Sequence, residues 1–193
     1  MMYRLAAAAG LFAMSAGLAL AQTPATTPAT GTAAGGTVAK TDKDLKEYQL
    51  AAVSKVTLAQ ALTTAEKQGE KGRAIDADFE KADGKNPNHY SIKVVYPDGK
   101  LVEYGINADD GALYKTENQP IERYFTRLKP ADFQKATVSL KDALVIAEKK
   151  AGGGKAYEAE VEREGASVEY EIKVAHADRE QTVKVGPDGK VVD

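Results

Sequence analysis

VTLAQALTTAEK, at Val56–Lys67, decides the fold because the pattern returns as VSLKDALVIAEK at Val138–Lys149. A second segment, YSIKVV at Tyr90–Val95, returns in the same order as YEIKVA at Tyr170–Ala175. Recurrence of one supersecondary unit along a chain fixes the fold class and the number of units. The sequence therefore predicts two tandem copies of a single structural unit.

Each copy is expected to begin with a helix. Thr57 with Gln60, and Ser139 with Asp142, have the spacing of a capping box, in which a hydroxyl and a side-chain acceptor satisfy the first free amides of a helix. Small and apolar residues then recur at i, i+3, i+4 and i+7, the spacing of one buried helix face. These residues are Leu58, Ala61, Leu62 and Ala65 in the first copy, and Leu140, Ala143, Leu144 and Ala147 in the second.

Strand patterns follow each helix. Apolar residues alternate with acidic ones at 75–80 and 157–162, and the Tyr-x-Ile-x-Val segments alternate in the same way, as half-buried antiparallel strands do. Further strands are expected at 101–106 and 181–185, with short apolar pieces at 112–114 and 191–192. The fold class is therefore α+β: two tandem repeats, each a helix packed on one face of a three- to four-stranded antiparallel sheet. We expect the repeats to pack through their sheet edges or their helix faces.

The N-terminal region is expected to direct the chain out of the cytoplasm. Residues 1–21 contain Arg4, an apolar run and Ala-Leu-Ala before Gln22, the pattern of a cleaved secretory signal peptide. An uncleaved anchor is the alternative, but the apolar run is shorter than the ~20 residues of a spanning helix. No stable membrane anchor is therefore expected after cleavage, and the protein should be periplasmic or secreted. Residues 22–40, rich in Thr, Ala, Pro and Gly, are expected to form a disordered linker.

The remaining chain divides into a first repeat at 41–115, an inter-repeat helix and linker at 116–137, and a second repeat at 138–193. Within the middle segment, the apolar residues Ile121, Tyr124, Phe125 and Leu128 have helical spacing. We interpret them as core between the repeats, with an exposed partner-binding ridge as the alternative.

Composition excludes several functions. The chain has no Cys and two His, which excludes disulfides and Cys-based metal sites or nucleophiles. Its formal net charge of −2 argues against nucleic acid as a partner. His89 and His176 form no motif with each other or with a nucleophile, so both are expected at the surface or at strand ends. We therefore predict no enzyme activity, no catalytic residue, no cofactor and no defined metal site.

The most prominent polar feature is a row of acidic residues on the outer side of each first strand. Lys93 and Lys173 should point to the same side from the adjacent strands. A solvated face with cross-strand acid–lysine pairs is one interpretation. A docking face for a basic peptide, or a loose divalent-cation site, is the other. The candidate partner-binding residues are Asp76, Asp78, Glu80, Lys93, Glu158, Glu160, Glu162 and Lys173.

These motifs resemble the PepSY domain at about 56–114 and 138–193. The resemblance rests on the helix with its alanine stripe, the Tyr-x-Ile-x-Val strand and a closing turn at 107–113 and 186–191. Asn107 and Gly186 stand where the family usually has Asp.

The resemblance implies a secreted or envelope protein, since PepSY units occur in propeptides of secreted metallopeptidases and as free-standing periplasmic proteins. It implies a non-enzymatic protein-binding module that restrains or modulates a peptidase. A periplasmic small-ligand or divalent-cation binding protein and an envelope-assembly accessory remain as alternatives.

Overall fold

Eight strands form one continuous antiparallel sheet in the order β4-β3-β2-β1-β5-β6-β7-β8. The structure is a computed structural model, and it describes residues 42–125 and 128–192. The elements are η1 (Asp42–Asp44), α1 (Glu47–Val53), α2 (Leu58–Glu66), β1 (Arg73–Glu80), β2 (His89–Val95), β3 (Leu101–Asn107), β4 (Leu113–Asn118), α3 (Pro120–Phe125), η2 (Pro130–Lys135), α4 (Leu140–Lys150), β5 (Lys155–Glu164), β6 (Ser167–Ala175), β7 (Glu180–Val185) and β8 (Val191–Val192).

The predicted α+β class, with helices on an antiparallel sheet, is confirmed. Helix α2 is followed by β1–β4, and α4 is followed by β5–β8, so the two halves have the same element order. The halves meet through β1 and β5, two first strands that pair edge to edge. Of the two packing arrangements expected from the sequence, the sheet edge makes the principal join, and the sheet becomes one unit of eight strands.

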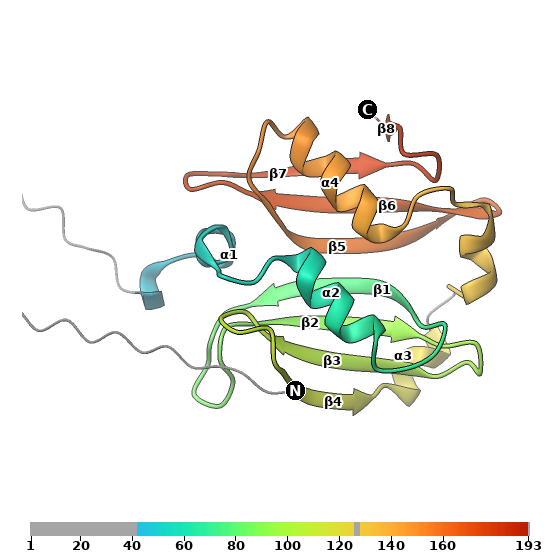
Figure 1. Cartoon of the computed structure of the whole chain (residues 1–193), viewed down its shortest axis with the longest axis horizontal. Coiled ribbons are helices and arrows are strands. Elements are labelled where there is room, and N and C mark those ends of the chain that lie inside the picture. Colours follow the sequence, from blue (N-terminus) through green and yellow to red (C-terminus); the bar gives the residue numbers. More distant parts are fainter. Residues whose placement is uncertain (1–41, 126–127, 193) are drawn as a thin grey trace, which may run out of the picture. The chain divides into compact units, whose positions relative to one another are not determined.

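Helices α1, α2 and α4 cover one face of the sheet (Figure 1). The predicted stripe residues of α2 and α4 are all buried against it. Both predicted capping boxes form, because the Thr57 and Ser139 hydroxyls accept from the amides of Gln60 and Asp142 at 3.3 and 3.2 Å. Local sequence thus positions each helix start, and the apolar stripe anchors the helix on the sheet.

The same contacts hold helix to sheet in both halves. The hydroxyl of Tyr90 donates to the carbonyl of Val56 at 2.9 Å, and the hydroxyl of Tyr170 donates to the carbonyl of Val138 at 2.8 Å. The first strand of each half also has a bulge at the same place, between Ala74 and Asp76 in β1 and between Ala156 and Glu158 in β5.

Helix α1 was not anticipated, and it packs on the second half although it precedes the first. It contacts β5 and β6, and the hydroxyl of Tyr48 donates to the carbonyl of Asp178 at 3.3 Å. After its end, the carbonyl of Ser54 accepts from the Lys155 ammonium at 2.6 Å. The segment before α2 therefore ties the two halves together.

The middle segment differs from its prediction. Strand β4 runs to Asn118, past the boundary placed at residue 115, so the segment 116–137 begins inside a strand. Helix α3 forms, but Ile121 is 78 % exposed, so the expected core stripe is wrong at that position. Leu128 and Phe133 are buried, whereas the side chains of Tyr124 and Phe125 lie outside the described residues. Helical spacing places Ile121 on a common helix face, but it does not decide whether another element covers that face, and at Ile121 the side chain stays exposed.

The predicted signal peptide and linker, residues 1–40, lie outside the described residues. Among the residues that are described, no helix is long and apolar enough to cross a membrane.

Candidate docking face

The side of the sheet opposite α1, α2 and α4 carries the charged residues. Alternate side chains of each strand point to this open face, because successive residues in a strand point to opposite sides. Acidic side chains outnumber basic ones on it. The acidic residues are Asp76, Asp78, Glu103, Glu117, Glu158, Glu160, Glu162, Glu169 and Glu171, and the lysines are Lys93, Lys115, Lys173 and Lys184.

The centre of the open face is the join between the two halves. Strands β1 and β5 pair at three positions, of which two place carboxylates directly opposite each other: Asp76 against Glu160 and Asp78 against Glu158. Directly opposed residues have Cβ atoms about 4.5–5.5 Å apart. Two acidic rows predicted in separate repeats thus become one cluster. We call these four residues the carboxylate seam.

The predicted lysines flank the seam from the neighbouring strands. The Lys93 ammonium lies 3.5 Å from Asp76 Oδ1 and 2.9 Å from Glu122 Oε1 of α3. The Lys173 ammonium lies 2.7 Å from Glu158 Oε1. Each lysine therefore pairs with one seam carboxylate, and the two paired carboxylates, Asp76 and Glu158, are the ends of one diagonal of the cluster.

The other two seam carboxylates, Asp78 and Glu160, form no ion pair with any residue that the structure describes. Burial, reinforced by the neighbouring carboxylates of Asp76 and Glu158, raises the pKa of Asp78 to about 7. Burial, together with the charges of Asp76 and Glu162, also raises the pKa of Glu160. The seam thus contains two acids that have no ion pair of their own among the described residues, and the charge of Lys93 offsets the raised pKa of Asp78 only in part.

The remaining acids of the predicted set lie outside the seam, although Glu162 is close enough to Glu160 to raise its pKa. Glu80 Oε2 is 3.4 Å from Nε2 of His89, at one end of β1. Glu162 Oε2 is 3.3 Å from the ammonium of Lys184, which also pairs with Glu171 at 2.9 Å. The structure therefore brings together the four seam carboxylates and the two lysines, places Glu162 beside them, and leaves Glu80 apart with His89.

His89 differs from its expected surface position. It does begin a strand, but only 5 % of it is exposed. Its Nδ1 lies 2.9 Å from the Pro87 carbonyl oxygen, and its ring packs edge-on against Tyr114 with centroids 5.2 Å apart. Tyr114 can cover it because Gly105 has no side chain: a Cβ there would lie 2.7 Å from the tyrosine ring.

A hollow of about 460 Å³ opens at the Asp76–Glu160 end of the seam. Ile75 and Leu128 provide apolar lining, and Asp76, Glu160 and Glu162 provide carboxylates. Ile75 belongs to this site because the bulge at Ala74/Asp76 interrupts the alternation of β1. Sequence reasoning missed this role, since alternation alone predicts that Ile75 lies with Ala77 under the helix.

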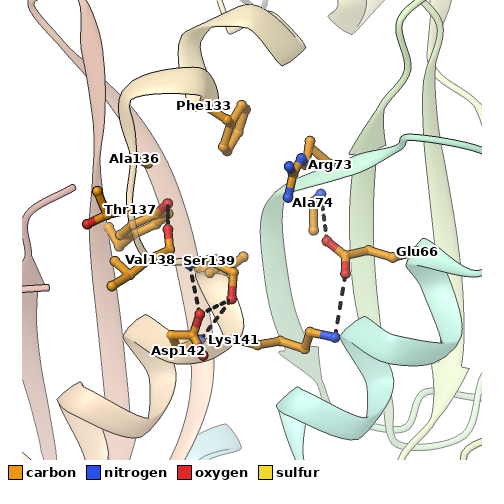
Figure 2. A pocket seen from close by; sticks show the side chains of 12 residues that line it. Glu66, Arg73, Ala74, Phe133, Ala136, Thr137, Val138, Ser139, Lys141 and Asp142 are labelled. Atoms are coloured by element: carbon orange, nitrogen blue, oxygen red, sulfur yellow. Dashed lines mark hydrogen bonds and ion pairs between the residues drawn. The ribbon is translucent and has the colours of Figure 1, made fainter. Parts of the chain in front are cut away.

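A second hollow, of about 470 Å³, lies on the helix side between α2 and α4 (Figure 2). Lys141 of α4 reaches toward α2, 3.9 Å from Glu66 Oε2 and 3.4 Å from the hydroxyl of Thr63. Ser139 and Asp142 point at each other, because their side chains form the capping box of α4. The polar groups of this hollow therefore already serve as links between and within the helices.

Among the described residues, no three His, Asp or Glu side chains are arranged to hold a metal ion. The seam carboxylates stand side by side on a sheet surface, whereas metal ligands must converge on one point.

Comparison with known proteins identifies the first half. Residues 55–117 match the family model described as "Peptidase propeptide and YPEB domain", PepSY. No curated protein matches the chain. A crystal structure of a "putative lipoprotein" from Clostridium difficile 630 is 19 % identical, with a TM-score of 0.42, and the match covers 72 % of this chain and 92 % of that one. Residues 55–117 of the chain are thus similar to the PepSY domain.

Proposed function

We propose that this protein is an extracytoplasmic, non-enzymatic binding module that docks a basic segment of a protein partner across the carboxylate seam. The observation that carries the proposal is the pair Asp78 and Glu160, two acids at the centre of the open face that form no ion pair among the described residues. Electrostatic complementarity with a positive patch would give a partner both specificity and a faster encounter.

The class of partner follows from the family. A domain related to peptidase propeptides is suited to bind a peptidase, so we propose a secreted or periplasmic peptidase whose activity the module restrains. The signal-peptide pattern at residues 1–21 supports the same compartment.

The hollow beside the seam supports a basic partner. Lysine and arginine lay their aliphatic stems along apolar surface and keep the charged head in a polar environment. Ile75 and Leu128 offer such a surface, and Asp76 and Glu160 stand beside it. A partner side chain of this kind fits the hollow better than a small neutral ligand does.

The test compares the wild type and two variants, all spanning residues 22–193, as inhibitors of co-secreted peptidases. One carries Asp78→Asn and Glu160→Gln, and its matched control carries Glu47→Gln and Glu70→Gln, which remove two exposed acids remote from the seam. We expect near-stoichiometric inhibition by the wild type and the control, and at least about tenfold weaker inhibition by the seam variant, since each lost charged contact contributes roughly 1 kcal/mol or more. Equal inhibition by all three versions would remove the seam from the docking surface.

The competing function is a cation or small-ligand carrier. It predicts that a divalent cation raises the melting temperature of the wild type and not that of the seam variant, following mass action. A cation-dependent shift of this kind, together with no inhibition of any peptidase, would replace our proposal with the carrier.

A further inference from the structure

The carboxylate seam is an unusual place to join two halves of a sheet. Like charges directly opposite each other on neighbouring strands are destabilising. Both outward-facing pairs of the β1–β5 ladder are nevertheless acid against acid, with only Ala77 and Ala159 between them. The join is completed elsewhere, by α1 packing on β5 and by Lys141 between the two long helices.

The charged groups around the seam compensate it on one diagonal only. Strand β2 contributes Lys93 and strand β6 contributes Lys173, which pair with Asp76 and Glu158. The other neighbours are acidic: Glu122 of α3 takes part of the charge of Lys93, and Glu162 of β5 and Glu171 of β6 lie beside Glu160. Asp78 and Glu160 therefore face carboxylates from β1, β5 and β6. Lys93 and Lys173 act on Asp78 from beyond ion-pair distance, and neither acid forms an ion pair among the described residues.

We propose that protons and the basic partner compete for Asp78 and Glu160, so that the docking face binds its partner at neutral to alkaline pH and releases it on acidification. The inference rests on the proposed docking function and adds its regulation. A protonated carboxyl removes the opposed charge within the seam, and a partner's ammonium or guanidinium group does the same from outside. Either one relieves the repulsion, and one carboxylate cannot accept both.

The titration of the seam agrees with this geometry. The pKa of Asp78 is raised to about 7 from its ordinary 3.8, so this carboxyl holds a proton in the folded protein at pH values where the unfolded chain has lost it. A raised carboxyl pKa contributes stability that is greatest when the group is protonated and that falls as pH rises toward about 7. Partner affinity should change in the opposite direction, because the charged form is the one that binds a cation.

The first experiment uses an alternating Lys-Ala peptide as the probe and measures its dissociation constant at constant salt between pH about 5 and about 8. Lysine keeps its charge over this range, so the probe itself does not titrate. We expect wild-type affinity to fall by about tenfold at the acidic end. The Asp78→Asn/Glu160→Gln variant should bind weakly at both ends, and the Glu47→Gln/Glu70→Gln control should follow the wild type.

The outcomes separate the two proposals. Binding of the probe to the wild type with no change in affinity across this pH range would overturn proton control and leave the docking face intact. Binding that is equally strong in the seam variant would place the contact elsewhere and overturn both. Absence of binding at every pH would overturn both as well.

A second measurement needs no partner. The melting temperature of the wild type should fall as pH rises from about 5 to about 8, and the fall should be smaller in Asp78→Asn, whose amide does not titrate. The Glu70→Gln control should keep the wild-type slope. An identical slope in wild type and Asp78→Asn would overturn the proton-binding role of this residue, whatever the peptide shows.

Discussion

The two halves of the molecule share the contacts that hold helix to sheet. They differ in the side chains that lie on the open face and in what covers those side chains. In the first half, Tyr114 lies across Gly105, and Lys93 reaches α3 through Glu122. At the position of Gly105 the second half has Lys184, which pairs with three glutamates. The helix-covered face thus has the same contacts in both halves. The open face is partly covered by Tyr114 and α3 in the first half and carries a network of ion pairs around Lys184 in the second.

This difference indicates which parts of the pattern serve folding and which are free to serve binding. Burial and capping constrain the helix side equally in both halves, because any loss there leaves a cavity or an unpaired amide. The open face is constrained only by solubility and by its partner. The following changes test that division, in order of expected effect.

The largest effect should come from the buried leucines of the two helices. Leu62 and Leu144 are 0 % and 1 % exposed and occupy matching positions, so Leu62→Ala and Leu144→Ala should each cost about 2–5 kcal/mol in the free energy of unfolding. Because one sheet spans both halves, urea denaturation followed by circular dichroism should show a single transition for either variant.

Val145→Ala on the exposed side of α4, where the side chain is 62 % exposed, is the control and should change stability by no more than about 0.5 kcal/mol. Two transitions, with each leucine variant shifting only one of them, would show that the halves unfold independently despite their shared sheet.

The second effect distinguishes the halves. In Gly105→Ala the new Cβ would lie 2.7 Å from the Tyr114 ring and 2.9 Å from Lys115 Cβ, so the ring must move off His89. We expect a loss of about 1–3 kcal/mol in thermal or chemical denaturation.

Gly84→Ala, where a Cβ would meet nothing within 4 Å, is the matched control and should be nearly neutral. Adding Tyr114→Ala to Gly105→Ala should remove the part of the loss that comes from the ring and leave the part that comes from Lys115 Cβ. If Gly105→Ala is as stable as the wild type, the Tyr114 ring does not pack firmly over Gly105 and His89.

The sequence predicts the elements well because their signals are local. The capping boxes at Thr57 and Ser139, the helical stripes and the alternation in the strands depend on residues a few positions apart. The acidic rows could be found in the same way. Their convergence could not, because the pairing of β1 with β5 joins segments far apart in the chain and leaves no pattern in either one.

Three other features could not be predicted from the sequence, each for a physical reason. Helix α1 has seven residues, too few for a clear period, and its contacts with the second half are long-range. The bulge that moves Ile75 into the hollow changes the alternation by a single residue. The spacing of Ile121 with the other apolar residues of its segment predicts a shared helix face. It does not predict whether another element covers that face.

A third comparison concerns the two tyrosines that anchor helix to sheet. In Tyr90→Phe the single hydroxyl proton of Ser54, which lies 2.9 Å from the Val56 carbonyl and 2.8 Å from that of Ala51, can turn to Val56 while the Ser54 amide still donates to Ala51. The cost should therefore be about 0.5–1 kcal/mol. In Tyr170→Phe the carbonyl of Val138 loses the one side-chain donor that the structure describes for it, and the cost should be about 1–2 kcal/mol.

Equilibrium denaturation of both variants gives this difference directly. A double variant should show additive losses, because the two sites share no partner. The opposite order, with Tyr90→Phe the more damaging, would mean that the link between Tyr90 and Ser54 matters more than the carbonyl left behind.

The smallest effect, and the most informative about the seam, should come from its two lysines. Lys93 contacts two carboxylates and its side chain is 21 % exposed, whereas Lys173 contacts one and is 35 % exposed. Lys93→Gln should therefore cost more than Lys173→Gln, both within the ~0.2–1 kcal/mol typical of partly exposed ion pairs. Each loss should shrink at acidic pH and at high salt, since protonation and screening both weaken the attraction between the lysine and the acid cluster.

Lys85→Gln, on an exposed loop, supplies the control for a generic change in charge. If the two seam variants lost the same free energy at pH about 5 and about 8, the lysines would act through packing alone, and the seam would not be the charged centre on which the docking face depends.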